Sequence, residues 1–265
     1  HRRDGAALIE FLSWFDAHAL DGLTEIDMAK KLEECRAGTG VLMDLSFDTI
    51  SSTGPNAAVI HYRVTEETNR KLQPGDLFLL DSGGQYPDGT TDITRTMPVG
   101  VVDAERRDAY TRVLQGMIAV SRARFPRGVA GGHLDALARF PLLVAGMDYD
   151  HGTGHGVGVN VHEFPPRIAP RAPTPVLEGQ VFSIEPRVYL DGELEQAEER
   201  YRQALDRRPD DPAALYNLGT LLRVSGRRDE ALVHLRKAAM GPEGHPDVVR
   251  AAEAVEKLSR PKKNL

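Results

Sequence analysis

The sequence predicts a mixed α+β domain over residues 1–191, followed by an all-α region over residues 192–265. Two observations support this division. Before residue 191, short apolar or β-branched runs alternate with helical stretches and are separated by connections rich in Gly and Pro. After it, the chain is charged and rich in Ala and Leu almost to its end, as in packed helices. We therefore expect two structural units that meet near residue 191.

Four stretches of the first unit carry apolar residues at helical spacing. The hydroxyl of Thr24 lies where it can cap the N-terminus of the second stretch. The third stretch is long and amphipathic. The predicted helices cover residues 6–15, 24–32, 104–125 and 132–140.

Strands are predicted where short apolar runs are bounded by turn residues. The clearest run covers residues 77–80, which follow the turn dipeptide Pro74-Gly75 and end at Asp81. A second β-branched segment begins after Asp92. The other predicted strands cover residues 58–64, 181–184 and 188–190.

The second unit repeats itself with a period of 34 residues. Such a period, with small residues where two helices touch, resembles the tetratricopeptide repeat. Leu215, Leu218, Gly219 and Leu222 fit the first helix of a full repeat, and residues 247–258 fit a capping helix. Helix packing is the simplest interpretation, and a protein partner bound through the repeats is the alternative. The recurring positions are Gly192, Ala197, Tyr201, Ala204 and Pro209, then Gly226, Ala231, Leu235, Ala238 and Glu243.

Composition argues against several classes of function. With 33 Lys and Arg against 39 Asp and Glu, the net charge of -6 disfavours a nucleic-acid partner, because neutralising phosphates needs surplus basic charge. No run approaches the ~18 consecutive apolar residues of a membrane span, and no signal peptide opens the chain. A single cysteine, Cys35, cannot form an internal disulfide. We therefore expect a cytoplasmic globular protein with no membrane partner.

Two carboxylates border neighbouring predicted strands. Asp81 ends one apolar run and Asp92 precedes the next, with a turn-rich segment between them. At the facing ends of adjacent antiparallel strands, two such side chains can converge on one cation. Acidic residues are also common in turns. The pair by itself leaves metal binding and turn chemistry open.

Three histidines lie within one Gly-rich segment. His151, His155 and His162 are interleaved with four glycines, a pattern that core packing does not explain. Glycine lets the backbone approach closely, and neutral imidazole is a common metal ligand. Solvated loop histidines are the alternative. Glu185 ends another apolar run, where a carboxylate alone would be an ordinary strand end.

Short motifs occur in a definite order and spacing along the first unit. Together they resemble the catalytic domain of the pita-bread metallopeptidases, and within that family the Xaa-Pro aminopeptidase (aminopeptidase P) branch. The resemblance covers roughly residues 1–191. It implies a curved antiparallel sheet flanked by helices, a dinuclear site often occupied by manganese, and a proline-containing peptide substrate. The motifs are FDTISSTGPN at 47–56, IHY at 60–62, LDSGG at 80–84, DITRT at 92–96, HGTGHGVG at 151–158, VHE at 161–163 and SIEP at 183–186.

The resemblance implies four metal ligands. Asp81 would bind one metal ion and Asp92 would bridge both, while His155 and Glu185 would complete the ligands of the other. Oxygen-rich sites suit manganese. Two cations can polarise the scissile carbonyl and make a bound water nucleophilic near neutral pH.

The resemblance also implies roles for three histidines. His162 corresponds to the proton shuttle of the family, and His61 and His151 correspond to histidines that contact the substrate. Because proline at the second substrate position has no amide N–H, specificity must come from shape and from holding the free amino terminus.

The fifth metal ligand of the family has no counterpart here. It is a Glu in a Gly-[Ile/Val]-Arg-x-Glu strand about twenty residues after the last of the four ligands, where this chain has Arg208. The sequence after Asp191 instead continues into predicted helices, so the C-terminal strand of the sheet is missing. One cation would keep three protein ligands, and the other only Asp81 and the shared Asp92. We expect one Mn²⁺ or none, and weak catalysis.

Three functions therefore fit the sequence. The leading one is a metal-dependent aminopeptidase that releases the N-terminal residue from peptides with proline at position two, impaired by the lost ligand. A prolidase-like dipeptidase is the related alternative. A catalytically inactive pseudo-peptidase fused to a protein-interaction repeat module is the alternative from another class. Phe164 and Arg187 stand where the family commonly has Gly, and Phe164 would narrow the cleft.

Overall fold

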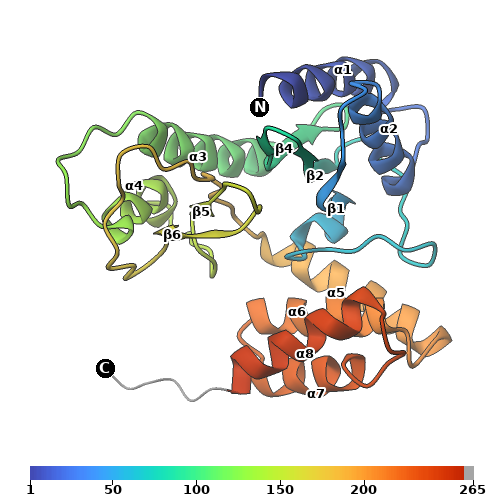
Figure 1. Ribbon diagram of the computed structural model, residues 1–265. Helices are drawn as coiled ribbons and strands as arrows, with labels where there is room; N and C mark the ends of the chain where they lie inside the picture. Colours follow the sequence, from blue (N-terminus) through green and yellow to red (C-terminus); the bar gives the residue numbers. More distant parts are fainter. Residues whose placement is uncertain (260–265) are drawn as a thin grey trace.

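The computed structural model describes residues 1–259, which form an α/β part and a group of four C-terminal helices (Figure 1). The α-helices of these residues are α1 (Arg2–His18), α2 (Glu25–Ala37), α3 (Ala104–Ser121), α4 (Gly131–Leu143), α5 (Asp191–Arg207), α6 (Pro212–Val224), α7 (Arg228–Ala238) and α8 (Pro246–Ser259). The strands are β1 (Asp44–Thr53), β2 (Leu77–Tyr86), β3 (Gly89–Thr90), β4 (Ile93–Pro98), β5 (Gly154–Gly156) and β6 (Glu163–Ile168), and a 3-10 helix, η1, covers Gly54–Ala58.

Local chemistry explains the two N-terminal helices. Thr24 caps α2 through a reciprocal pair: the Asp27 N–H donates to the Thr24 hydroxyl, and the Asp27 carboxylate accepts from the Thr24 N–H. Helix α1 packs its apolar face on the sheet, where Phe15 stacks on Phe78 of β2 with ring centroids 5.3 Å apart. The predicted helices over residues 6–15 and 24–32 are confirmed.

Strand β2 is the centre of the larger antiparallel sheet. It pairs with β1 along one edge and with β4 and β3 along the other. Asp81 of β2 lies opposite Ile50 of β1 and Thr94 of β4. The predicted strand over residues 77–80 and the segment after Asp92 are therefore confirmed as neighbours, although β2 is longer than predicted.

A smaller sheet, β5 with β6, forms under helices α3 and α4 (Figure 1). Residues 181–185 run beside β5, since the Ser183 N–H donates to the His155 carbonyl at 2.8 Å. The predicted strand over 181–184 forms only an isolated bridge, between Phe182 and Gly156. The predicted strand over 188–190 is wrong, because this segment is irregular and leads directly into α5.

The prediction of a strand over residues 58–64 is also wrong. The segment consists of the end of η1 followed by turns, and His61 has a left-handed backbone with φ 56°. Val59 and Ile60 are both buried, so their side chains do not alternate between core and solvent. The segment is apolar because it is enclosed between the sheet and the C-terminal helices.

Strands β1, β3, β5 and β6 were not predicted. Strand β1 is rich in Ser, Thr and Asp, yet its last five residues are buried. Strand β6 contains Pro165 and Pro166, which cannot donate to a ladder and normally argue against a strand. Helices α3 and α4 confirm the predicted helices there, although α3 ends at Ser121 rather than at residue 125.

Helices α5–α8 lie together and pack against the α/β part beneath β1 and η1 (Figure 1). One hydrophobic cluster joins Val59 and Tyr62 with Tyr201 of α5 and Leu218 of α6. Helices α6 and α7 approach closely at Gly219, where a Cβ atom would lie 2.6 Å from the Leu235 side chain. The predicted helices of this region are confirmed, while residues 260–265 of the predicted second unit lie outside the described residues.

Within residues 1–259, each helix is too short or too polar to cross a lipid bilayer.

Candidate metal centre

Three predicted ligand side chains meet between the two sheets. Asp92, immediately before β4, His155 of β5 and Glu185 offer ligand atoms within 4.8 Å of one another. His155 Nε2 lies 3.3 Å from Asp92 Oδ2 and 3.1 Å from Glu185 Oε1. These residues are far apart in the sequence, so their meeting is a property of the fold.

Backbone pairing places Glu185 beside His155. The Glu185 N–H donates to the Thr153 carbonyl at 2.7 Å, next to the Ser183–His155 hydrogen bond. The Ser183 hydroxyl donates to Glu185 Oε1 at 2.6 Å and thereby orients the carboxylate. Sequence reasoning did not assign a role to Ser183. Its spacing carried the signal, because residues i and i+2 of an extended segment share one face.

The orientation of the His155 ring suits a metal ligand. Nδ1 lies 3.0 Å from the Gly156 carbonyl, which can only accept, so Nδ1 carries a proton and Nε2 is the ring nitrogen that faces the carboxylates and can bind a metal ion. Burial lowers the pKa of His155, but hydrogen bonds to Asp92 and Glu185 outweigh burial and raise it to about 10. In the protein alone, a proton on Nε2 therefore takes the position of a cation.

Asp81 faces the same cluster from β2. Burial, followed by the negative charges of Asp92 and Glu185, raises the pKa of Asp81 to about 7. Its Oδ1 atom is buried without a hydrogen-bond partner among the described residues. Buried polar atoms are normally satisfied, and crowded carboxylates repel one another unless a cation lies between them. The side chains present therefore fit a divalent cation.

The three predicted histidines surround this cluster. The ring of His162 lies 4.2 Å from that of His155, and the ring of His151 lies 4.9 Å from that of Tyr149. His61, His151 and His162 each interact electrostatically with Glu185.

All three imidazoles have lowered pKa values. Part of His61 is open to solvent, but the surrounding protein and then the guanidinium of Arg223 lower its pKa to about 4. Burial is also the main cause of the lowered pKa values of His151 and His162. The three rings are therefore mainly neutral at pH 7.

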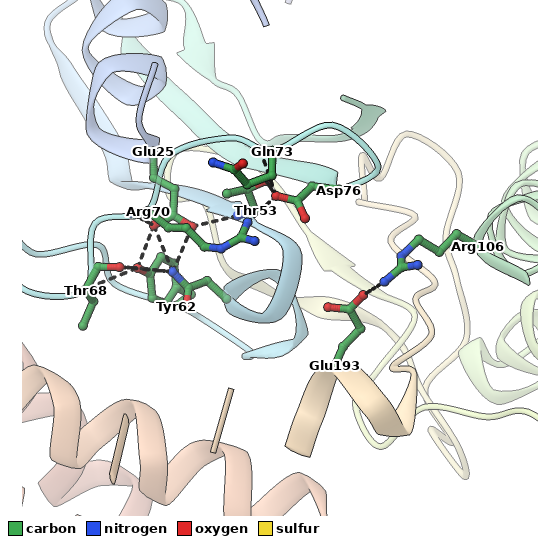
Figure 2. Close-up of polar contacts among 10 residues, drawn as sticks. Glu25, Thr53, Tyr62, Thr68, Arg70, Gln73, Asp76, Arg106 and Glu193 are labelled. Atoms are coloured by element: carbon green, nitrogen blue, oxygen red, sulfur yellow. Dashed lines mark hydrogen bonds and ion pairs between the residues drawn. The ribbon is translucent and has the colours of Figure 1, made fainter. Parts of the chain in front are cut away.

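Helix α5 begins at Asp191, shortly after Glu185 in the chain. Glu193, near its start, pairs with Arg106 of α3 (Figure 2), and its side chain is only 14% exposed. Arg208, which occupies the position expected for the fifth metal ligand, pairs with Glu67. Neither contact brings a carboxylate to the metal centre.

A guanidinium borders the metal centre instead. Arg187, two residues after Glu185, donates to the Ala57 carbonyl and lies over the ring of Tyr189 at 5.0 Å. Its charge opposes the raised pKa of Asp81. Arg187 therefore adds positive charge beside the carboxylates, a contact that the sequence did not reveal.

Asp, His and Glu side chains that converge from two antiparallel sheets and the segments beside them form the donor set of a metal-dependent protein. A model of metallopeptidase family M24 matches residues 1–225, and the chain belongs to this family. The match runs past residue 191 into α6.

Curated relatives include a "Probable Xaa-Pro aminopeptidase P" of Aspergillus fumigatus, 49% identical over 202 residues, which are 73% of this chain and 31% of the relative. A protein of the same description from Paracoccidioides brasiliensis is 48% identical over 202 residues, 73% of this chain and 33% of its own length. The chain spans about a third of the length of these relatives.

Solved structures show the same fold. An X-prolyl aminopeptidase from Caenorhabditis elegans, described as a cytosolic enzyme with a di-nuclear active site, is 33% identical with a TM-score of 0.66, over 90% of this chain and 46% of that one. The prolidase from Pyrococcus furiosus is 31% identical with a TM-score of 0.60, over 68% of this chain and 54% of its own. The prediction of a pita-bread-like fold with helices and antiparallel sheets is confirmed.

Proposed function

We propose that this chain is a metal-dependent aminopeptidase that releases the N-terminal residue from peptides with proline at position two. One observation carries the proposal: Asp92, His155 and Glu185 converge from separate segments beside Asp81, whose Oδ1 has no hydrogen-bond partner within residues 1–259. The names of the relatives from Aspergillus fumigatus and Caenorhabditis elegans support the choice of an Xaa-Pro substrate.

Asp81, Asp92, His155 and Glu185 would hold the metal, for which we propose Mn²⁺. When bound, the metal supplies Lewis acidity and an activated water. We expect one ion per chain, because the described carboxylates of α5 do not replace the fifth ligand; Glu193, for example, pairs with Arg106. Two tight sites in a calorimetric titration with Mn²⁺ would contradict this expectation.

The histidines would handle the proton and the substrate. His162 lies beside His155, and a mainly neutral imidazole can accept a proton and return it. His61 and His151 would contact the peptide. The Nδ1–H of His151 donates to the Gly152 carbonyl at 2.7 Å, which leaves its Nε2 as a hydrogen-bond acceptor.

We also propose that α5–α8 are tetratricopeptide-like and separate from the catalytic unit near residue 191. Helices α5 to α8 pack in consecutive pairs, and Ala197 and Ala231, which are 34 residues apart, are both fully buried. This bundle is the surface on which a protein partner would bind. A cytoplasmic location is supported by the single Cys35 and by the cytosolic relative from Caenorhabditis elegans.

The test is cleavage of an Ala-Pro-Ala tripeptide with Mn²⁺ and with EDTA, followed by mass spectrometry of released Ala. Ala-Ala-Ala is the matched control, and the dipeptide Ala-Pro distinguishes a prolidase-like enzyme. We expect Mn²⁺-dependent release of Ala from Ala-Pro-Ala, and none from Ala-Ala-Ala or the dipeptide Ala-Pro. Equal cleavage of Ala-Ala-Ala would refute the proline preference.

The second candidate function is a pseudo-peptidase that binds peptides without cutting them. The start of α5 at Asp191, in place of a final strand, favours it. This alternative predicts that Ala-Pro-Ala binds, as measured by calorimetry, while no Ala is released at saturating Mn²⁺. Measurable release would exclude it.

A further inference from the structure

A buried carboxylate outside the metal centre closes the segment that carries His61. Glu25, the first residue of α2, is fully buried. Its Oε1 accepts from the Thr53 N–H at 2.8 Å, and its Oε2 accepts from the Arg70 N–H at 3.1 Å (Figure 2). Thr53 and Arg70 begin and end one segment, residues 53–70, which we call the His61 loop. One side chain therefore joins the two ends of this loop.

Two side chains within the His61 loop bind the same carboxylate. Asn56 Nδ2 lies 3.0 Å from each oxygen of Glu25, and the Tyr62 hydroxyl lies 2.9 Å from Oε2. Tyr62 directly follows His61, and Figure 2 shows its hydroxyl directed at Glu25. The contacts thus reach the residue adjacent to the histidine.

The outer side of the His61 loop rests on the C-terminal helices. Val59 and Tyr62 pack in one cluster with Tyr201 and Leu218. Asn217 donates from Nδ2 to the Arg63 carbonyl at 3.3 Å. The loop is therefore held from inside by a carboxylate and from outside by α5 and α6. Such support explains how His61 keeps a left-handed backbone without being glycine.

We propose that Glu25 is a positioning residue: by closing the His61 loop, it holds His61 in place beside the metal centre. This inference rests on the proposed contact of His61 with substrate. Glu25 itself does not touch the metal-centre residues in any described hydrogen bond. Without its acceptors, the buried N–H of Thr53 and the partly buried N–H of Arg70 lose their partner, and the loop opens at both ends.

Two tyrosines provide a matched comparison. The hydroxyl of Tyr62 bonds to Glu25, and that of Tyr86 donates to the buried carboxylate of Asp4 at 2.7 Å, away from the loop. Tyr62→Phe and Tyr86→Phe remove the same chemistry from the two places. Glu25→Gln is the stronger change, because it replaces one acceptor oxygen with a donor.

We expect Tyr62→Phe to raise the KM for Ala-Pro-Ala about tenfold, the scale of one lost buried hydrogen bond. Glu25→Gln should raise it by between about tenfold and 100-fold, the scale of a misplaced binding group. Tyr86→Phe should leave KM unchanged. The Mn²⁺ affinity of all three variants, measured by calorimetry, should match that of the parent protein.

Hydrogen–deuterium exchange tests, independently of activity, whether Glu25 closes the His61 loop. Exchange of residues 53–70 should become faster in Glu25→Gln and Tyr62→Phe, and stay unchanged in Tyr86→Phe. Equal effects of the two tyrosine changes on KM and on exchange, or an unchanged loop in Glu25→Gln, would overturn the inference. A parent protein that cuts no Ala-Pro-Ala contradicts the proposed function instead, while the exchange result still tests the closure by Glu25.

Discussion

The buried carboxylate of Glu25 and the partly buried carboxylates of the metal centre are satisfied in opposite ways. The described partners of Glu25 all donate to it, from backbone and side chains. At the metal centre, Asp81 and Asp92 face Glu185, and one oxygen of Asp81 has no described hydrogen-bond partner. The comparison teaches that the balance of donors and acceptors, more than burial, distinguishes a structural carboxylate from a metal ligand.

A third buried carboxylate gives the intermediate case. Asp4 forms an ion pair with Arg36 at 2.7 Å, and both side chains are fully buried. There the protein supplies the cation itself. Glu25 is matched by hydrogen-bond donors and Asp4 by a guanidinium, whereas the metal centre gathers several carboxylates, one of which has an oxygen without a described hydrogen-bond partner.

The largest effect is expected from a substitution in the metal centre itself. Asp92→Asn removes a charged ligand, so we expect Mn²⁺ affinity to fall by at least about 100-fold, because even changes to residues behind the ligands cost 10- to 100-fold. Calorimetric titration measures it, and release of Ala from Ala-Pro-Ala should be lost as well. Glu25→Gln is the control, since it should keep the parent affinity. A similar loss of Mn²⁺ affinity in Asp92→Asn and Glu25→Gln would show that Glu25 and the metal-centre carboxylates do not differ in metal binding.

A second change removes the outer support of the His61 loop. Leu218→Ala leaves a cavity in the cluster with Tyr62 and Val59, and we expect about 2–5 kcal/mol less stability in urea unfolding. Val233→Ala, an exposed position of α7, is the matched control with little expected change. A small loss for Leu218→Ala would show that α6 contributes little to the α/β part.

A third change tests the charge state of Glu25. Burial raises its pKa to about 7, although its donors oppose this rise. The folded state therefore binds the proton more tightly than the unfolded state. The contribution of Glu25 to stability is greatest below pH 4.5 and declines by up to about 3 kcal/mol as the pH rises through 7.

Urea unfolding of Glu25→Gln and the parent protein at pH 5 and pH 7.5 measures this decline. The parent should lose more stability between these two values than the variant does, because glutamine does not titrate. Parallel pH profiles would indicate that the donors hold Glu25 ionised throughout.

The smallest effect is expected at the surface. Arg127 and Glu178 form an ion pair with side chains 95% and 86% exposed, so water screens their attraction. Arg127→Ala should leave the Tm unchanged in differential scanning calorimetry. A clear fall in Tm would mean that charge at the surface, and not only in the core, stabilises the fold.

Much of the candidate site was predictable, because its residues belong to short motifs with distinctive spacing. Asp81 lies in β2 and Asp92 directly precedes β4, the strand paired with it, and the glycines around His155 mark a segment where chains approach closely. The cap of α2 and the apolar periodicity of α1 and α2 are equally local signals. These features depend on neighbours in the sequence.

Other features depend on contacts between distant segments. Glu25 follows a helix cap, where glutamate usually faces solvent; it is buried because residues 53–70 wrap around it. Residues 58–64 are apolar because α5 and α6 cover them, which a local pattern cannot distinguish from a strand. Strand β1 is polar and forms through its pairing with β2.

The boundary predicted near residue 191 has a practical consequence for the preparation of shorter fragments of this chain. Val59, Tyr62 and Leu79 share their apolar surroundings with Tyr201 and Leu218. A fragment that ends near residue 191 would expose these apolar side chains to water and would aggregate. The predicted boundary near residue 191 therefore does not coincide with a boundary of the hydrophobic core.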